Sequence, residues 1–201
     1  MAQPRRPYYV SFRHDPIPTR VDHSRSSPGP STGTADRAGY TIARLAGRGG
    51  LTFAWDVGGA RADRQVPLFA RSVNVYFYLT DFVVAISADY TEGSCAYNAT
   101  RRHEYEAHLY QPIRIFHSYR DPMITRLNGI AMPTQDAPRW VLPQAVATTQ
   151  NALEQQVLAE VLAVRQALAT ALHADRDLQD DRTHYRSVYR QCPAAEWSRR
   201  P

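Results

Sequence analysis

The alternation of apolar and polar positions predicts several β-strands in the first half of the chain. Residues 8–12 follow the two-residue period of a strand, and residues 40–45 and 51–55 do so more weakly. Glycines between the last two segments suit a hairpin connection. The strongest patterns are residues 72–79 and 83–90, which are short, β-branched and aromatic. The three residues between them predict a second hairpin or adjacent pair of strands.

Helical spacing replaces the strand pattern after Gly93. Ser94 or Asn98 is a suitable N-cap for a helix that runs through Tyr110. Pro112 has no N–H to donate to the carbonyl four residues earlier, so we expect a kink or a break there.

Two further helical segments follow. The first covers residues 113–127, with a possible break at Pro122 and a stop signal at Asn128-Gly129. The second is long, covers residues 144–180, and has Pro143 in its first turn. Its apolar face is spaced at the helical period and comprises Leu153, Val157, Leu158, Val161, Val164, Leu168 and Leu172. This pattern predicts a structural helix that covers the sheet or pairs with the first helix; a coiled-coil interface is the alternative.

These segments together predict an α+β fold. We expect a small, mostly antiparallel sheet with two or three helices packed on one face, including one long C-terminal helix. Residues 1–38 are rich in Pro, Ser, Arg and Gly and predict a flexible or loop-rich arm. Residues 39–201 then form a single α+β domain, which is long enough to bury a core.

Composition narrows the class of protein. Apolar residues make up 43% of the chain and charged residues 21%, which is ordinary globular usage. Neither a transmembrane segment nor a signal peptide is predicted, because no long apolar run occurs and none follows the N-terminal arginines. The net charge is +5, all basic residues other than histidine are arginines, and these arginines are scattered along the chain. Nucleic-acid binding is therefore not expected, since a phosphate-binding surface would cluster its charge.

The chain has two cysteines, Cys95 and Cys192, without the C-x-x-C spacing of a zinc site. They are either buried thiols in a reducing compartment or one long-range disulfide in an oxidising compartment.

The segment His-Glu-Tyr-Glu-Ala-His, residues 103–108, is one residue longer than the H-E-x-x-H motif of zinc peptidases. In that motif the histidines lie four apart and reach one zinc ion, with the glutamate as general base. Here His103 and His108 are five apart, about 140° around a regular helix, which would strain a shared ion. A single π-bulge would bring both onto one face, and Pro112 makes such an irregularity less costly.

Two alternatives remain open for this segment. Glu104 and His108, four apart, are possible ligands with His103 or Glu106 beside them. In either case a third ligand comes from elsewhere, and the candidates are His117, Asp121 and Glu160. The other interpretation has no metal: a solvated helix face whose arginines and glutamates form i,i+3 or i,i+4 pairs.

An ordered set of features carries a resemblance to a known family. Strand 83–90 is followed by Cys95, the segment 103–108, the long helix and Cys192. This order resembles a group of bacterial proteins of unknown function that are predicted to be secreted or periplasmic and zinc-peptidase-like. The resemblance covers roughly residues 73–197, and it departs from the family at one point, where the second histidine falls at 108 instead of 107.

The resemblance implies a disulfide between Cys95 and Cys192. It also implies that His103 and His108 are zinc ligands and that Glu104 is the base for amide hydrolysis, while Tyr110 or Tyr119 would polarise the carbonyl.

The function implied is a zinc-dependent, peptidase-like hydrolase of the bacterial cell envelope, periplasmic or secreted, which acts on a peptide or protein. The alternative is a catalytically inactive member of the same scaffold that serves as an envelope interaction or structural protein and binds a protein partner. A cytoplasmic location is the alternative to the envelope.

Overall fold

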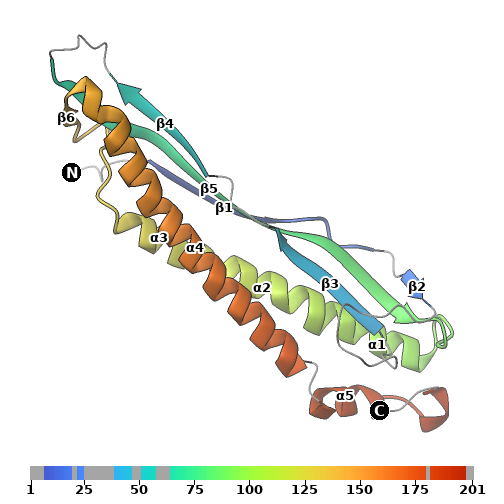
Figure 1. The fold of residues 1–201 in the computed structure, drawn as a ribbon. Helices are drawn as coiled ribbons and strands as arrows, with labels where there is room; N and C mark the ends of the chain where they lie inside the picture. The colour runs from blue at the N-terminus through green and yellow to red at the C-terminus, as the bar shows by residue number, and fades with distance from the viewer. Residues whose placement is uncertain are drawn as a thin grey trace. The chain divides into compact units, whose positions relative to one another are not determined.

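The computed structural model describes residues 7–19, 22–24, 39–46, 51–57, 64–179 and 182–197. In these residues the chain has an α+β fold, in which six strands form one mixed sheet and the C-terminal half is helical (Figure 1). The strands are β1 (Tyr8–His14), β2 (Asp22–Ser24), β3 (Gly39–Ala46), β4 (Leu51–Val57), β5 (Val66–Ser87) and β6 (Arg139–Val141). The longer helices are α1 (Cys95–Tyr105), α2 (Gln111–Ser118), α3 (Arg120–Asn128), α4 (Val146–Gln179) and α5 (Arg182–Tyr189). The predicted fold class and long C-terminal helix are confirmed.

The strand β5 organises the sheet, because each of the other described strands pairs with it. β2 pairs with it in parallel, from Asp22 opposite Ala85. β4 pairs in antiparallel register, from Leu51 opposite Val75, and so does β6. The sheet is therefore held together by a single strand of 22 residues.

The predicted hairpin within residues 72–90 is wrong, because β5 continues through it. The three intervening residues stay in the strand, and Asp81 takes a positive φ of 58°. The Asp81 N–H donates to the Asp15 carboxylate at 3.1 Å. Buried positions are odd-numbered from Val73 to Leu79, and beyond Asp81 the buried residues are Val84, Ala85 and Ile86. The sequence signal at Asp81 thus marks an irregularity that shifts the alternation, not a reversal of the chain.

The predicted hairpin between residues 40–45 and 51–55 is also wrong. Both strands exist, as β3 and β4, but each pairs with β5. The length of β5 explains this outcome, since it offers each short strand its own stretch of edge. Residues 47–50, which hold the glycines of the connection, lie outside the described residues.

The helix boundaries agree with the sequence signals. Ser94 caps α1, since its hydroxyl accepts the N–H of Tyr97 at 3.2 Å. The break between α2 and α3 falls at Tyr119, so that Pro122 lies in the first turn of α3. A short 3-10 turn, Pro143–Ala145, leads into α4.

The apolar face of α4 is buried at five of the predicted positions, namely Leu153, Val157, Val161, Val164 and Leu168. Leu158 is 37% exposed and lies at the edge of that face. Judged by length and composition alone, the segment Pro143–Gln179 is the one helix of the described residues that is long and apolar enough to cross a membrane. The core helix of a soluble protein meets the same criterion, so the expected absence of a transmembrane segment stays a prediction.

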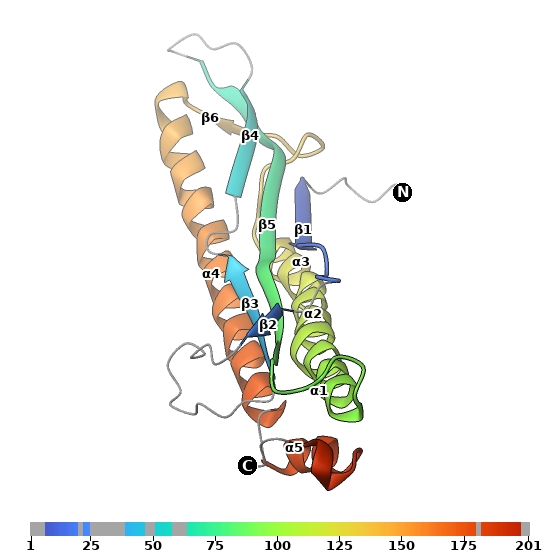
Figure 2. The same ribbon diagram turned by 90° about the vertical axis from the view of Figure 1, so that its right-hand side faces the viewer.

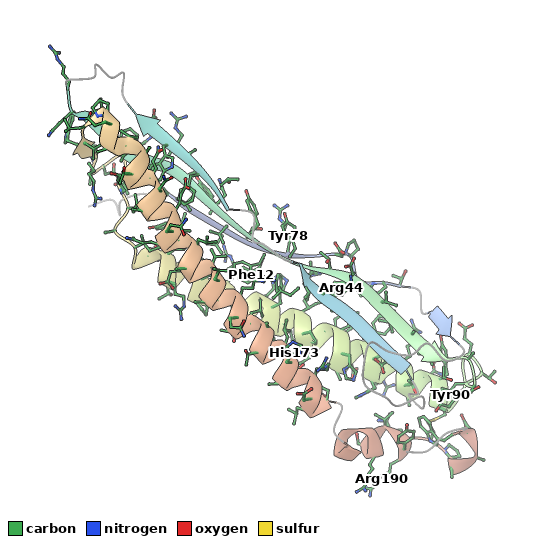
Figure 3. The ribbon with its side chains drawn as sticks, viewed as in Figure 1. Phe12, Arg44, Tyr78, Tyr90, His173 and Arg190 are labelled. Atoms are coloured by element: carbon green, nitrogen blue, oxygen red, sulfur yellow. A yellow bond between two sulfur atoms is a disulfide. The ribbon has the colours of Figure 1, made fainter. Side chains whose placement is uncertain are left out.

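The chain divides into two compact units, each built from three separate segments. Unit 1 comprises Met1–Arg13, Ala46–Tyr78 and His117–Leu168, and unit 2 comprises His14–Leu45, Leu79–Phe116 and Ala169–Pro201. In each unit the helices lie to one side of the strands (Figures 1 and 2). Within unit 1, the strands β1 and β5 are joined by an aromatic contact: Phe12 stacks on Phe77 with ring centroids 4.5 Å apart (Figure 3 labels Phe12). The predicted arm contributes β1 and β2, and its boundary with the domain stays a prediction.

Candidate functional site

The candidate site begins at a π-helical turn that follows α1 in unit 2. The turn covers Glu106–Tyr110, and the N–H of Gln111 donates to the carbonyl of Glu106, five residues earlier. Pro112 supplies the physical reason, because it has no N–H for the His108 carbonyl and its ring would clash with that carbonyl in a regular helix. An extra residue in the turn relieves both problems. The π-bulge that the five-residue spacing requires is therefore present.

The π-turn brings His103 and His108 together. Their Nε2 atoms are 3.1 Å apart, and the ring planes are nearly perpendicular at 86°. Two arrangements suit this distance. One ring donates an N–H to the other, or both nitrogens bind one ion, since ligands about 2.0–2.1 Å from a tetrahedral zinc lie about 3.3 Å from each other. The separation of the two nitrogens is thus compatible with a shared zinc ion and equally with a hydrogen bond between the rings.

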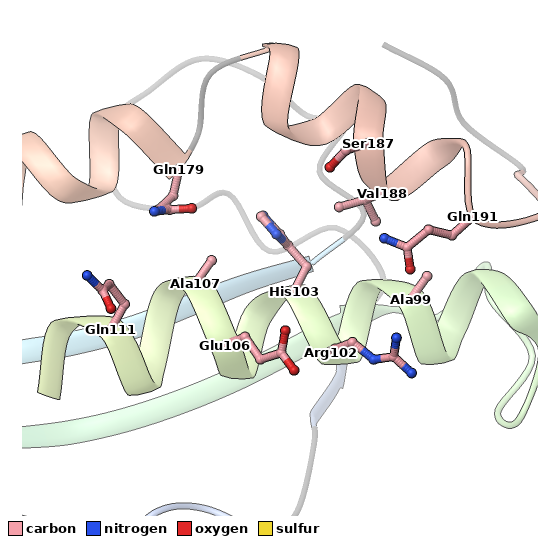
Figure 4. A pocket seen from close by; sticks show the side chains of 10 residues that line it. All are labelled: Ala99, Arg102, His103, Glu106, Ala107, Gln111, Gln179, Ser187, Val188 and Gln191. Atoms are coloured by element: carbon pink, nitrogen blue, oxygen red, sulfur yellow. The ribbon is translucent and has the colours of Figure 1, made fainter. Parts of the chain in front are cut away.

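His103 opens onto a hollow of about 320 Å³ between the helix and the C-terminal segment (Figure 4). Figure 4 shows His103 pointing from α1 toward Ser187 and Val188. The hollow is mostly polar, and its lining comprises Ala99, Arg102, His103, Glu106, Ala107, Gln111, Gln179, Ser187, Val188 and Gln191. Amide, hydroxyl and charged groups therefore line the hollow onto which His103 opens.

The predicted base, Glu104, is buried at 1% exposure. Its Oε2 accepts the hydroxyl of Thr41 on β3 at 2.8 Å. Glu104 does not line the hollow, whereas the exposed Glu106 does. The catalytic role of Glu104 stays a prediction, and Glu106 is the carboxylate that faces the hollow.

Asp175 of α4 is a carboxylate near the pair that the sequence analysis did not select. Burial raises its pKa, while a hydrogen bond from Gln179 and the charge of His108 lower it. Its Oδ2 is buried and has no hydrogen-bond partner. A signal existed in the sequence, because Asp175 lies seven residues after Leu168 and so continues the apolar stripe of the helix.

The three predicted third ligands all belong to unit 1. Glu160 accepts a hydrogen bond from Arg126 at 2.7 Å, and His117 and Asp121 are exposed. Within the part of the chain that the structure describes, no three His, Cys, Asp or Glu side chains form a group able to hold one metal ion. The structure therefore brings together two of the predicted ligands, and the third stays a prediction.

The two tyrosines proposed to polarise the substrate carbonyl lie in different places. Tyr110 ends the π-turn and is 39% exposed. Tyr119 belongs to unit 1, and its hydroxyl donates to the carbonyl of Ala167 at 3.3 Å.

The disulfide between Cys95 and Cys192 is present, as predicted. It joins the first residue of α1 to the segment after α5. Next to it, Glu196 Oε2 accepts the N–H groups of Cys95 at 2.8 Å and of Ala96 at 3.3 Å. A carboxylate at a helix N-terminus satisfies free N–H groups and complements the helix dipole.

An apolar cluster reinforces this attachment. It is formed by Ile86, Tyr90, Ala96, Tyr97, Ala99, Val188 and Trp197, with Tyr189 and Cys192 packed against it. Trp197 lies edge-on to both Tyr90 and Tyr189. The disulfide, the carboxylate cap and this cluster together hold the C-terminal wall of the hollow against α1.

Comparison with models of known families, with characterised proteins and with solved structures gives no match.

Proposed function

We propose that the protein is a zinc-dependent hydrolase of peptidase type that binds zinc through His103 and His108. One observation carries the proposal: the π-turn sets the two Nε2 atoms 3.1 Å apart, in spite of their five-residue spacing. A π-turn interrupts the regular hydrogen-bond pattern of the α-helix, and such turns are rare and concentrate at functional sites. A bound zinc ion would supply a water molecule of lowered pKa for attack on an amide.

The neighbouring groups differ in the role they can take. Asp175 is a carboxylate of unit 2 that interacts electrostatically with His108, but it does not form with the two histidines a group able to hold one metal ion, so the proposal assigns no third ligand. Glu106 lines the hollow and is exposed, so it is placed to accept a proton from water, whereas Glu104 is the base that the sequence order implies. The polar lining of the hollow suits the N–H and C=O groups of a peptide.

The disulfide supports an extracytoplasmic location. Disulfides persist in the periplasm and outside the cell and are rare in the cytosol. We therefore propose that the protein works in the cell envelope or as a secreted protein.

The first test is the zinc content of protein purified without chelator. We expect about one zinc per chain in the wild type, and loss of the metal in His103→Ala and in His108→Ala. His173→Ala is the matched control, because His173 is an exposed histidine of α4 (Figure 3). A folded wild-type protein that takes up no zinc would overturn the proposal.

The second test is hydrolysis of a fluorogenic unfolded protein such as labelled casein. Glu104→Gln and Glu106→Gln distinguish the two candidate bases, and loss of a general base typically lowers the rate about 10²- to 10⁴-fold. Zinc content is measured in parallel, so that loss of metal is not mistaken for loss of the base.

A second candidate function is a non-catalytic envelope protein on the same scaffold. The burial of Glu104 and its bond to Thr41 favour this alternative, because they give that carboxylate a structural role. Stoichiometric zinc without hydrolysis of any peptide substrate would favour it over the hydrolase.

A further inference from the structure

Unit 1 contains a second hollow, larger than the first and separate from the histidine pair. Its volume is about 510 Å³, and strand β1 and helix α3 form most of its wall. We call it the β1 groove, and its lining comprises Tyr8, Tyr9, Val10, Ser11, Arg13, Asn74, Tyr76, Arg120, Ile124 and Asn128.

The β1 groove is cationic. Arg13 and Arg120 line it, and its lining includes no acidic residue. Arg13 donates through Nε to the hydroxyl of Ser11 at 3.1 Å, and neither arginine forms an ion pair with a carboxylate of the described residues. Two other arginines of this unit do form such pairs, Arg71 with Asp56 and Arg126 with Glu160. Within the described residues, the two arginines of the groove therefore have no carboxylate paired with them, whereas other arginines of the same unit do.

The groove also follows the edge of a strand. β1 is the last strand on its side of the described sheet and pairs with β5 alone. The carbonyl of Pro7 accepts the N–H of Val73 at 2.6 Å, so Pro7 faces β5. Successive residues of a strand present their backbone groups to opposite edges. Val10, three residues later, therefore presents its N–H and C=O to the edge away from β5.

Aromatic side chains complete the surface. Tyr9 is 64% exposed, and Tyr76 of β5 also lines the groove. Aromatic residues on a sheet pair well with β-branched side chains of a neighbouring strand. Asn74 and Asn128 add amide donors and acceptors to the same lining.

We propose that the β1 groove binds an extended acidic peptide segment, which adds to β1 as a further strand. Backbone hydrogen bonds to the edge of β1 would supply affinity, and Arg13 and Arg120 would select for carboxylates. The last strand of a sheet is a template for such pairing, and unlike-charge contacts beside it set specificity. This site is independent of the proposed zinc chemistry, because all its lining residues belong to unit 1.

The probe is a fluorescein-labelled, eight-residue peptide of alternating threonine and glutamate, about 27 Å long when extended. Its binding to the full chain is measured by fluorescence anisotropy. We expect Arg13→Gln and Arg120→Gln each to weaken binding about tenfold, as the loss of a charge-assisted hydrogen bond predicts. Arg139→Gln is the matched control, because Arg139 is an exposed arginine of unit 1 outside the groove and should leave binding unchanged.

Strand addition is tested on the peptide, so that folding of the protein is not at issue. Two probes carry N-methyl groups, one on every threonine and the other on every glutamate, and each blocks one edge of the peptide backbone. Strand addition predicts that one of them binds about tenfold more weakly than the parent while the other binds normally. If both bind like the parent peptide, strand addition is overturned.

Two other results would also overturn the proposal. One is binding that the two groove variants leave unchanged, or no binding of the acidic peptide at millimolar concentration. The other is binding of polygalacturonate, an acidic glycan, in place of the peptide, because a glycan has no strand edge to offer. A glutamine analogue of the peptide should bind at least about tenfold more weakly than the glutamate form.

Discussion

At the scale of single residues, Glu104 depends on a hydrogen-bond partner, because its side chain is buried. Removing the hydrogen-bond partner of a buried polar group costs the desolvation free energy that the partner offset. We therefore expect Thr41→Val to lower the free energy of unfolding by about 1–3 kcal/mol, because the Thr41 hydroxyl donates to Glu104 at 2.8 Å. Urea unfolding measures the change. Thr52→Val, at an exposed position of β4, is the control and should change the midpoint little.

Tyr189 makes a prediction about alkaline pH. Burial, and then the charge of Tyr90, raise its pKa from 10.0 to about 12. A raised pKa means that the folded state holds the proton more tightly than the unfolded state, so this contribution to stability is complete below pH 10. It is lost as the pH rises through about 12. Urea midpoints of Tyr189→Phe should therefore fall less between pH 10 and 12 than those of the wild type.

The exposed Tyr9 provides the comparison, since Tyr9→Phe should keep the wild-type profile. If Tyr189→Phe and the wild type lose stability in parallel above pH 10, the alkaline sensitivity arises elsewhere in the chain.

At the scale of elements, we expect Pro112 to favour the π-turn that brings the two histidines together. Pro112→Ala restores an N–H for the His108 carbonyl and removes the clash that favours the π-turn. In a regular helix the two histidines would be about 140° apart. We expect this variant to be at least as stable as the wild type, and to bind zinc at least about tenfold more weakly by isothermal titration calorimetry.

This result would separate the two roles of the turn. Unchanged zinc affinity in a folded Pro112→Ala protein would mean that the π-turn does not depend on the proline, or that the pair does not hold the metal. A Pro112→Ala protein that is still helical but has a lower free energy of unfolding than the wild type would instead indicate that the proline ring has a packing role.

At the scale of the whole molecule, the disulfide closes a separation of 97 residues between Cys95 and Cys192. Cross-linking so long a loop reduces the entropy of the unfolded chain. We expect Cys95→Ser/Cys192→Ser to lower the free energy of unfolding by about 2–5 kcal/mol, measured by urea unfolding. As a control, the free energy of unfolding of the wild type is measured with and without reductant. If reductant leaves this value unchanged, the prediction is contradicted.

The loss should concentrate in the C-terminal segment. Without the bond, the attachment of this segment at the N-terminus of α1 rests on the Glu196 cap and the cluster around Trp197. Hydrogen exchange in residues 186–197 should therefore rise more than in α3, which belongs to the other unit.

Local signals in the sequence were enough to predict most elements. The Ser94 cap, the break near Pro122 and the stripe of α4 are effects of neighbouring residues, and each was found where predicted. The chain does not break at Pro112, because the π-turn leads directly into α2. The π-bulge, which the sequence left open as one of several alternatives, is also a local feature, because the histidine spacing and Pro112 concern the same helical turn. What failed was strand pairing. The hairpins predicted at Asp81 and between β3 and β4 are absent from the described residues, since pairing depends on distant partners.

The sequence by itself therefore determined most of the helices with their caps and breaks, the positions of the longer strand segments, and the residues of the histidine pair. Those features depend on interactions within a few residues of one another. Only the tertiary structure decided that one strand pairs with all the others, that Glu104 is buried beside Thr41, and that Asp175 lies near His108. Thr41 and Glu104 are 63 positions apart in the sequence, and His108 and Asp175 are further apart still. No local periodicity encodes them, because they depend on how the whole chain packs.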